Sequence, residues 1–421
     1  MPIQLSKLKS LQVLRYFVVG KDNKTKIGEL RELSDLHGEL HLRNLQNVPS
    51  GKDALEAKLM DKNNLEALCL NWNGKSNDST DDKEVLENLL PHTNLKMLYI
   101  NGYGGTSFPK WLGDVSFCNT VYIRLDKSWE EWCSIEVEDD EVFPELQELE
   151  IVGCDSSGSE VLLSSLTRTP AIRHLELGRC EKLEVQELPQ TMESISIGGC
   201  RGVESLMKAL RCLPATLTHL EIHYCEKLEF PMHHDSLKTS LQKYRHGLTC
   251  LSFLRIRGCL KFIYFPNGGL HASNLTGLIV NGCKRLKELP EQMANLLPSL
   301  EDLRIIDCPE VESFPEGGEG VESFPEEGLL PSTLTHLMME GFTSLKRLDI
   351  KVLQQLTSLT YLEIESCPQL LHLPQQKLPT SLTVLAINKC PILKERCQRD
   401  KGKDWNKISH IPGIYLDRKL I

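Results

Sequence analysis

The apolar residues of this chain follow one repeated order from about residue 146 onward. The order is Leu-x-x-Leu-x-Ile-x-x-Cys-x-x-Leu-x-x-Leu-Pro, and residues 275–290 are a nearly complete copy of it. The alternation in Leu-x-Ile is typical of a short β-strand with one buried face. The later apolar positions predict that the chain then turns back along the other side of that strand. Further copies begin at Leu146, Ile172, Met192, Leu217, Leu251, Leu300, Leu334, Leu359 and Leu382.

The spacing of these copies indicates a repeat protein. Most successive copies start 20 to 26 residues apart, and two intervals are 34 residues. The second long interval contains the duplicated hexapeptide Val-Glu-Ser-Phe-Pro-Glu, at residues 311–316 and 321–326. A period near 24 residues is within the leucine-rich-repeat range. Because one repeat cannot bury its own leucines, we expect stacked coils. The predicted fold is an α/β solenoid, a horseshoe or superhelical arc, with a parallel sheet on the concave face and short helices and loops on the convex face.

The pattern divides the chain into three parts. Residues 1–145 hold irregular repeats with helical and loop insertions, residues 146–396 hold regular repeats, and residues 397–421 are a C-terminal cap. In the first part we predict strands at residues 65–70 and 95–100, and weaker ones at 8–14 and 36–45. Apolar residues three or four apart predict helices at residues 53–62 and 82–90.

Composition and charge narrow the classes of function. The 421-residue chain has a formal net charge of −10, which disfavours binding to phosphate backbones. Its longest apolar runs fall short of the roughly 18 residues that span a bilayer. The first 20 residues lack a secretory pattern, and the odd number of cysteines, 15, favours reduced thiols. The predicted location is therefore the cytoplasm, with the nucleus as the alternative.

Nine of the cysteines occupy one slot of the repeat, at the end of each predicted strand. We expect a structural role there, in which each cysteine bonds the neighbouring backbone. The sequence contains no Cys-x-x-Cys and no His-Glu-x-x-His, so no metal site is predicted. It also lacks Gly-x-Ser-x-Gly and any convergent catalytic set, so we predict no enzyme activity. The slot residues are Cys154, Cys180, Cys200, Cys225, Cys259, Cys283, Cys308, Cys367 and Cys390.

The candidate binding residues are the outward positions of the predicted strands. If the coils stack, these positions form columns with about 5 Å between coils. We expect the early columns to be acidic and the middle to become basic, with exposed aromatic residues and methionine as anchors for a protein partner. The candidates are Glu150, Glu176, Glu221, Phe253, Arg255, Arg257, Arg304, Met338, Tyr361 and Glu363.

Aromatic residues at fixed places indicate a family. Trp72 follows a predicted strand, residues 102–111 read Gly-Tyr-Gly-Gly-Thr-x-Phe-Pro-x-Trp, and residues 129–132 read Trp-Glu-Glu-Trp. Residues 390–397 read Cys-Pro-x-Leu-Lys-Glu-Arg-Cys, followed at 404–412 by Asp-Trp-x-Lys-Ile-x-His-Ile-Pro. Over essentially its whole length, the chain closely resembles the leucine-rich-repeat region of plant nucleotide-binding leucine-rich-repeat (NLR) disease-resistance proteins of the coiled-coil class.

The resemblance implies a role in intracellular pathogen perception. It implies two partners, namely a pathogen effector or modified host protein, and the nucleotide-binding domain of the same receptor, which the repeats hold closed. This chain lacks the phosphate-binding Gly-x-x-x-x-Gly-Lys-Ser/Thr loop, so ADP or ATP would bind a domain outside it and no cofactor is expected here. We expect a fragment, a truncated product or a repeat-only relative. The alternative is a stand-alone repeat adaptor, such as a ubiquitin-ligase substrate-recognition subunit; an extracellular receptor is disfavoured by the missing signal.

Overall fold

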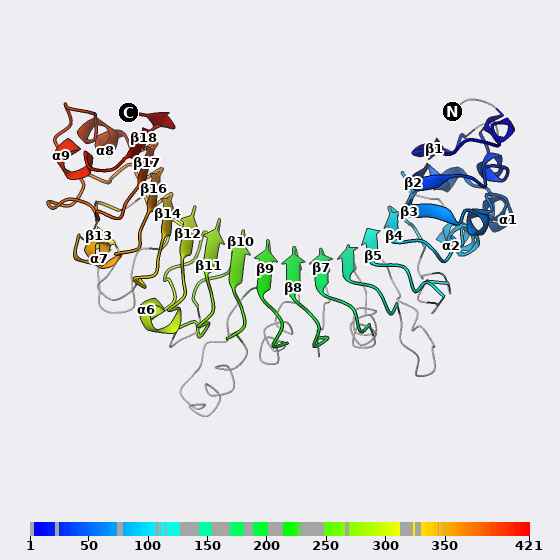
Figure 1. Cartoon of the computed structure of the whole chain (residues 1–421), viewed down its shortest axis with the longest axis horizontal. Coiled ribbons are helices and arrows are strands. Elements are labelled where there is room, and N and C mark those ends of the chain that lie inside the picture. Colours follow the sequence, from blue (N-terminus) through cyan, green and yellow to red (C-terminus); the bar gives the residue numbers. More distant parts are fainter. Residues whose placement is uncertain are drawn as a thin grey trace. The chain divides into compact units, whose positions relative to one another are not determined.

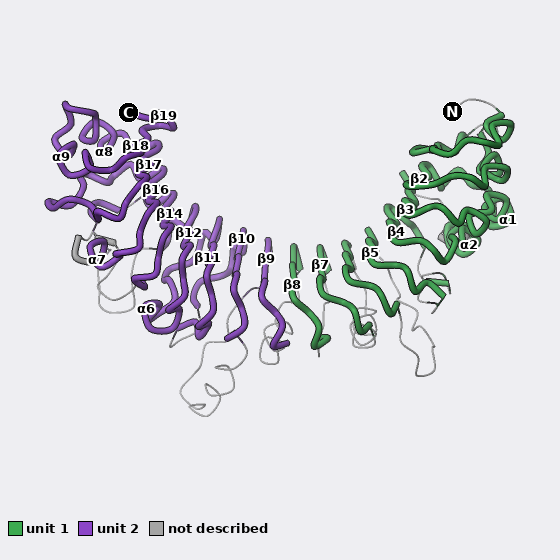
Figure 2. Tube along the Cα trace, viewed as in Figure 1, with its two compact units in different colours: residues 1–209 green, residues 210–421 purple. Residues whose placement is uncertain are grey.

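The computed structural model confirms a solenoid of parallel strands with few helices. It describes residues 4–21, 25–73, 79–105, 109, 111–112, 114, 116–126, 143–153, 169–180, 188–200, 214–225, 228, 248–265, 269–311, 323–324, 330–343, 345–348 and 350–421. The chain forms two compact units, residues 1–209 and 210–421 (Figure 2). In each unit the strands line one side of the coils and the helices lie on the other (Figure 1). None of the helices in the described ranges has both the length and the apolar character that crossing a bilayer requires.

In the first unit, each strand pairs in parallel with the next strand along the chain, from β1 to β8. Its elements are η1 (Leu5–Lys7), β1 (Tyr16–Val18), η2 (Ile27–Leu30), β2 (His37–Arg43), η3 (Leu45–Asn47), α1 (Gly51–Leu55), η4 (Leu59–Asp61), β3 (Asn64–Asn71), α2 (Ser79–Asn88), β4 (Met97–Asn101), β5 (Tyr122–Asp126), β6 (Glu148–Val152), β7 (His174–Gly178) and β8 (Ser194–Gly198).

In the second unit, the parallel order is β9, β10, β11, β12, β14, β16, β17 and β18, and β19 closes the sheet as an antiparallel partner of β18. Its elements are β9 (His219–His223), β10 (Phe253–Arg257), β11 (Gly277–Asn281), α6 (Met293–Leu296), β12 (Asp302–Ile306), β13 (Ser323–Phe324), β14 (His336–Glu340), β15 (Arg347–Leu348), α7 (Ile350–Gln355), β16 (Tyr361–Glu365), β17 (Val384–Asn388), α8 (Pro391–Arg396), α9 (Trp405–Ile408), β18 (Gly413–Leu416) and β19 (Lys419–Leu420).

Two predicted elements of the first unit were wrong in position. The strand expected at residues 8–14 lies at β1 instead, and Leu8 and Val13 are exposed, because their spacing does not alternate as a half-buried strand requires. The helix expected at residues 53–62 is two short pieces, α1 and η4, because Lys58 between them has a left-handed φ of 47°. Strand β5 was not predicted, and α2 begins three residues earlier than expected.

The core consists of the inward residues of the strands, which stack in register from coil to coil. Leu278 pairs with Leu303, which pairs in turn with Leu337 and so with Leu362. All four are fully buried, at 0% exposure. On β12 and β14 the residues that alternate with these inward positions are half-buried. Successive residues of a strand therefore face the core and the outward side in turn, and the parallel register aligns this alternation from coil to coil.

From β9 to β12, the chain leaves each strand through a residue in the left-handed region. Gly258, Gly282 and Asp307 have φ values of 63°, 66° and 52°. The N–H of Gly258 donates to the carbonyl of Asn281 at 2.7 Å, and that of Gly282 donates to the carbonyl of Ile306 at 2.8 Å. Each turn is thus held by the last residue of the next strand. Glycine is common there because only glycine adopts this conformation without steric cost.

Hydroxyl groups connect the coils where the chain enters the strands. The Oγ1 of Thr276 donates to the carbonyl of Ser252 at 3.0 Å, and that of Thr360 donates to the carbonyl of Thr335 at 3.1 Å. Thr383 continues the series with a 2.9 Å bond to the carbonyl of Thr360. These bonds satisfy carbonyls at the sheet margin and keep successive coils in register.

The C-terminal cap is anchored by the fully buried carboxylate of Asp404. It accepts hydrogen bonds from Arg396 at 2.7 and 3.1 Å and from Lys407 at 2.7 Å. The backbone N–H of Leu373, in the preceding coil, donates to it at 3.2 Å. Burial by itself would raise the pKa of Asp404, but these donors outweigh it and lower the pKa below the usual range.

Replacing Asp404 with asparagine should destabilise the second unit in a pH-dependent way. Breaking a buried pair of this kind costs about 3–5 kcal/mol near neutral pH. Because the folded-state pKa is lowered, this stability is present above the unfolded-state pKa and is lost as pH falls through the folded-state value. Urea unfolding of both proteins should show a large difference at neutral pH that shrinks in acid. A difference that is independent of pH would contradict the role of the charged carboxylate.

Candidate protein-binding surface

The outward positions of the second unit form rows across neighbouring strands. Arg255 pairs in register with Ile279, then Arg304, Met338 and Glu363, and so forms one row. Glu221 begins this row on β9. A second row, which contains Phe253 and Tyr361, runs beside it. The structure therefore places the candidate residues of this unit on one strand face.

Two aromatic pairs lie in the second row. The rings of His219 and Phe253 are 5.7 Å apart, and those of His336 and Tyr361 stack at 4.8 Å with an interplanar angle of 12°. Between the pairs, Gly277 leaves room for Phe253, since a Cβ there would lie 2.8 Å from the ring. Phe253, His336 and Tyr361 are half-buried, and rings held in this way offer apolar contact area with little conformational freedom left to lose.

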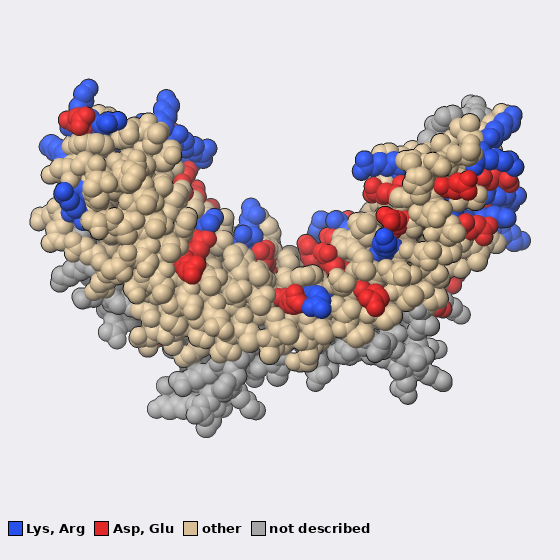
Figure 3. Space-filling view, viewed as in Figure 1, with Lys and Arg blue, Asp and Glu red and all other residues tan. Residues whose placement is uncertain are grey.

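Ion pairs within the chain compensate two of the three arginines expected to make the middle of this face basic. Arg255 Nη1 lies 3.2 Å from Glu221 Oε1. Arg304 donates to its strand neighbour Asp302 through Nε at 2.9 Å and through Nη2 at 2.8 Å. Arg304 and Asp302 are two apart on one strand and share a face, whereas Arg255 reaches Glu221 across the pairing of β10 with β9. The charge of each of these two arginines is therefore largely neutralised. Figure 3 shows positive and negative side chains interspersed along this side of each unit.

The carboxylates of Glu363 and Glu365, on β16, are also bonded to neighbouring side chains. Glu363 accepts from the Tyr361 hydroxyl at 2.9 Å and from Asn388 Nδ2 at 3.0 Å. Burial, and then the bond to Glu363, raises the pKa of Tyr361 above its usual range. Glu365, only 6% exposed, pairs with Lys389 Nζ at 2.6 Å. Arg255, Arg304, Glu363 and Glu365 are therefore all paired within the chain, beside the aromatic and aliphatic side chains of this face.

The two acidic candidates of the first unit, Glu150 and Glu176, differ in how exposed they are. Glu150 lies 3.2 Å from Arg124 Nη1 and accepts from the Tyr122 hydroxyl at 2.8 Å. Glu176, in register with Glu150 on the next strand, is exposed. The expected acidic column is thus partly neutralised.

The sequence analysis missed a group of tyrosines on the strand face of the first unit. Tyr99 and Tyr122 have ring centroids 5.1 Å apart, and Met97 lies beside them, with its sulfur 3.7 Å from the Tyr99 hydroxyl. Tyr16, on β1, is 40% exposed and lies under the guanidinium of Arg43 at 4.3 Å. The strand pattern Leu98-x-Ile100 indicates that Tyr99 faces outward, but the predicted candidates lie only in the regular repeats.

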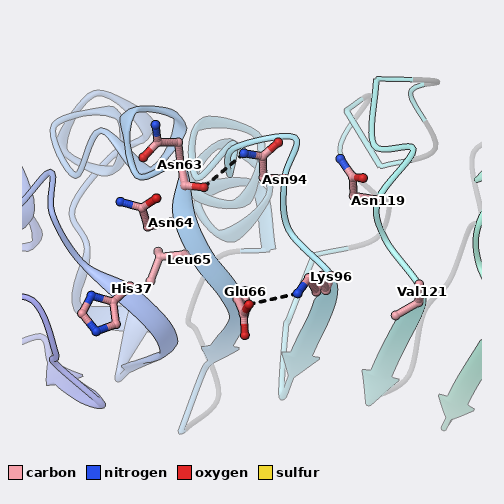
Figure 4. Close-up of a pocket in the computed structure, with 9 residues that line it drawn as sticks. All are labelled: His37, Asn63, Asn64, Leu65, Glu66, Asn94, Lys96, Asn119 and Val121. Atoms are coloured by element: carbon pink, nitrogen blue, oxygen red, sulfur yellow. Dashed lines mark hydrogen bonds and ion pairs between the residues drawn. The ribbon is translucent and has the colours of Figure 1, made fainter.

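A cavity of about 670 Å³ lies at the strand-entry side of the first unit. Figure 4 shows its lining: Asn94 reaches the backbone carbonyl of Asn63, and Lys96 reaches Glu66. These contacts measure 3.2 and 2.9 Å. The paired charges cancel, so the cavity is polar but neutral. Its lining consists of His37, Asn63, Asn64, Leu65, Glu66, Asn94, Lys96, Asn119 and Val121.

The cysteine slot has the structural role that was predicted. Cys259 Sγ donates to the carbonyl of Ile222 in the preceding coil at 3.9 Å, and the Cys180 N–H donates to Cys200 Sγ at 3.4 Å. All slot cysteines in the described ranges are buried, and none of them forms a disulfide. The neighbouring thiol and burial raise the pKa of Cys308, so this thiol stays protonated. Among the described residues, no group of three or more His, Cys, Asp or Glu could hold a metal ion.

Some predicted features lie outside the described residues. They are Cys154, the tryptophan motif at 129–132 and most of the duplicated segment at 311–326.

Comparisons with known proteins give the family of these repeats. A model described as R13L1/DRL21 LRRs matches residues 27–154, and one described as plant disease resistance protein RPS2-like, leucine-rich repeats, matches residues 263–391. The putative disease resistance RPP13-like protein 1 of Arabidopsis thaliana is 32% identical over 71% of this chain. The putative disease resistance protein RGA4 of Solanum bulbocastanum is 29% identical over 98% of it. The chain is a leucine-rich-repeat region of the plant disease-resistance type.

This repeat region spans only part of the length of its relatives. It covers 30% of the Arabidopsis protein and 38% of the Solanum protein. Among solved structures, it resembles a leucine-rich-repeat protein of Leptospira interrogans with 15% identity and a TM-score of 0.42, over 96% of this chain and 93% of that one. A Bacteroides eggerthii leucine-rich-repeat protein gives 14% identity and a TM-score of 0.42, over 99% and 69% of the two chains.

Burial of the slot cysteines predicts selective thiol chemistry in the native chain. Cys118 is exposed and Cys250 is half-buried, whereas Cys259, Cys283 and Cys367 are buried. Since a buried thiol reacts only when its coil opens, alkylation of these three should be about tenfold slower or more than that of Cys118. Peptide-resolved mass spectrometry after a short alkylation measures each rate, with the urea-unfolded chain as control. Equal rates at Cys118 and Cys283 in the native chain would contradict the slot geometry.

Proposed function

We propose that this repeat region is the recognition part of an intracellular plant immune receptor, and that its strand face binds a pathogen effector or a modified host protein. The observation that carries the proposal is the registered outward surface, with the pairs His219–Phe253 and His336–Tyr361, in a chain whose relatives are disease-resistance proteins. A repeat fold of this kind suggests protein–protein interaction, because stacking exposes a broad, rigid face.

The chemistry of the face supports a protein partner with apolar contact residues. Aromatic side chains dominate the affinity of many protein interfaces, whereas charged residues at their rims mainly set specificity and association rate. Here Arg255 and Arg304 are already paired with carboxylates of the same face. Phe253, Met338 and Tyr361 are therefore the proposed anchors, and the paired charges form their polar surroundings.

The second part of the proposal concerns signalling. The repeats restrain a nucleotide-binding switch in the resting receptor, and recognition on the strand face releases it. ADP or ATP would then bind the switch domain and not the repeats. The chain matches only about a third of the length of its relatives. This supports the placement of the nucleotide-binding switch in a different part of such a receptor.

Photo-crosslinking tests which face of the repeats contacts a protein partner. A photoreactive amino acid is placed at Tyr361, on the strand face, or at the exposed Lys377, on a loop between β16 and β17. In plant cells challenged with the pathogen, a protein adduct should form at Tyr361 and not at Lys377. Phe253→Ser should weaken binding of the crosslinked partner by about tenfold, since anchor residues contribute most of the affinity.

Two results would contradict the proposal. Adducts that form at Lys377 but not at Tyr361 would place recognition on the loop side. A separately expressed plant nucleotide-binding domain of the coiled-coil receptor class that fails to associate with the repeats would contradict the proposed restraint.

A further inference from the structure

At the edge of the sheet where the chain leaves β9 and β10, large apolar side chains are exposed close to a positively charged arginine. Tyr224 follows β9 and is 56% exposed, and Leu260 follows β10 and is 53% exposed. Arg257, the last residue of β10, is also exposed. Large side chains this exposed on neighbouring coils are candidates for contact with a partner. We refer to Tyr224, Arg257 and Leu260 together as the exit cluster.

The backbone holds the tyrosine of this cluster in place. Tyr224 has a left-handed φ of 52°, and its N–H donates to the carbonyl of Arg257 at 2.7 Å. The ring lies against Gly258, where a Cβ would come within 2.4 Å of Tyr224 Cδ1. The guanidinium carbon of Arg257 is 5.7 Å from the centroid of the ring. The ring and the cation are thus presented together on a fixed turn, with part of each still open to solvent.

The charge of Arg257 distinguishes it from the other candidate arginines. Arg255 and Arg304 have carboxylate partners at 3.2 and 2.8 Å. The structure gives Arg257 no ion pair with a described carboxylate, and the nearby Glu221 is already bonded to His223 at 2.9 Å. Lys261, one residue beyond Leu260, is exposed as well. Positive charge with no ion-pair partner among the described residues therefore lies beside exposed apolar surface.

We propose that the exit cluster binds an acidic segment of a partner polypeptide in which a carboxylate lies next to an apolar side chain. This deepens the recognition function proposed above and rests on it. The carboxylate pairs with Arg257, and the apolar neighbour covers Tyr224 and Leu260. An isolated acidic group would leave the apolar surface uncovered. A nucleic acid is disfavoured because the chain as a whole carries a net charge of −10, which repels a long polyanion.

Fluorescence anisotropy with defined probes tests the proposal on the full chain. The probes are a short dye-labelled peptide of alternating Glu and Leu, a matched peptide of alternating Glu and Ser, and a single-stranded oligonucleotide. The Glu/Leu peptide should bind most tightly. Arg257→Glu should weaken it by about tenfold, and Arg257→Gln by less. Tyr224→Ser and Leu260→Ser should bring the affinity for Glu/Leu down to that for Glu/Ser.

Lys377→Glu is the matched control, because it makes the same charge change at an exposed site on a loop. It should leave the affinity for the Glu/Leu peptide within about twofold of the unmodified chain, since only long-range screened charge is altered. All variants replace exposed side chains, and circular dichroism melting checks that they are folded.

The proposal is overturned if Arg257→Glu and Lys377→Glu have equal effects, if the oligonucleotide binds most tightly, or if no peptide binds. None of these outcomes depends on the cellular partner. Failure here with successful crosslinking at Tyr361 would reject the exit cluster alone and leave the strand-face function standing.

Discussion

Stacking of the inward leucines and isoleucines between successive coils is the interaction on which the rest of the structure depends. No coil can bury Leu278 or Leu303 by itself, and each is fully buried only because its registered neighbour covers it. The margins of the sheet are then held by hydrogen bonds between coils, through left-handed turns at the strand exits and threonine hydroxyls at the entries. The buried thiols of the slot add contacts of the same kind.

The same register determines which side chains lie on the outward face of the strands and which of them are neighbours. Since a strand alternates strictly, every buried leucine forces its neighbours outward, and parallel pairing aligns those neighbours with the next coil. Ion pairs such as Arg255–Glu221 then form across coils. In the proposed function, a surface of this kind would not recognise a partner through bulk charge. Its selectivity would come from a few aromatic anchors, and from the places where, as at Arg257, charge has no internal partner among the described residues.

The regular repeats were predictable from sequence because their phrase encodes burial directly. Leu-x-Ile followed by Cys marks both the strands and the cysteine slot that follows them. The first unit was less predictable, because Leu8 and Val13 mimic a repeat but lie exposed, and Lys58 divides a helical pattern with a left-handed turn. The sequence also could not predict which charged side chains form ion pairs with each other. Which carboxylate Arg304 reaches depends on its side-chain conformation, and the contact between Tyr224 and Gly258 joins residues 34 positions apart.

The most direct test of the stacking register is a comparison of two neighbouring isoleucines on β12. Ile305 is fully buried and points into the core, whereas Ile306 lies outward and is half-buried. Urea unfolding should show that Ile305→Ala lowers the unfolding free energy by about 2–5 kcal/mol. Ile306→Ala should lower it by about 1 kcal/mol or less. Equal losses, or a larger loss at Ile306, would contradict the register on which the core and the binding face both rest.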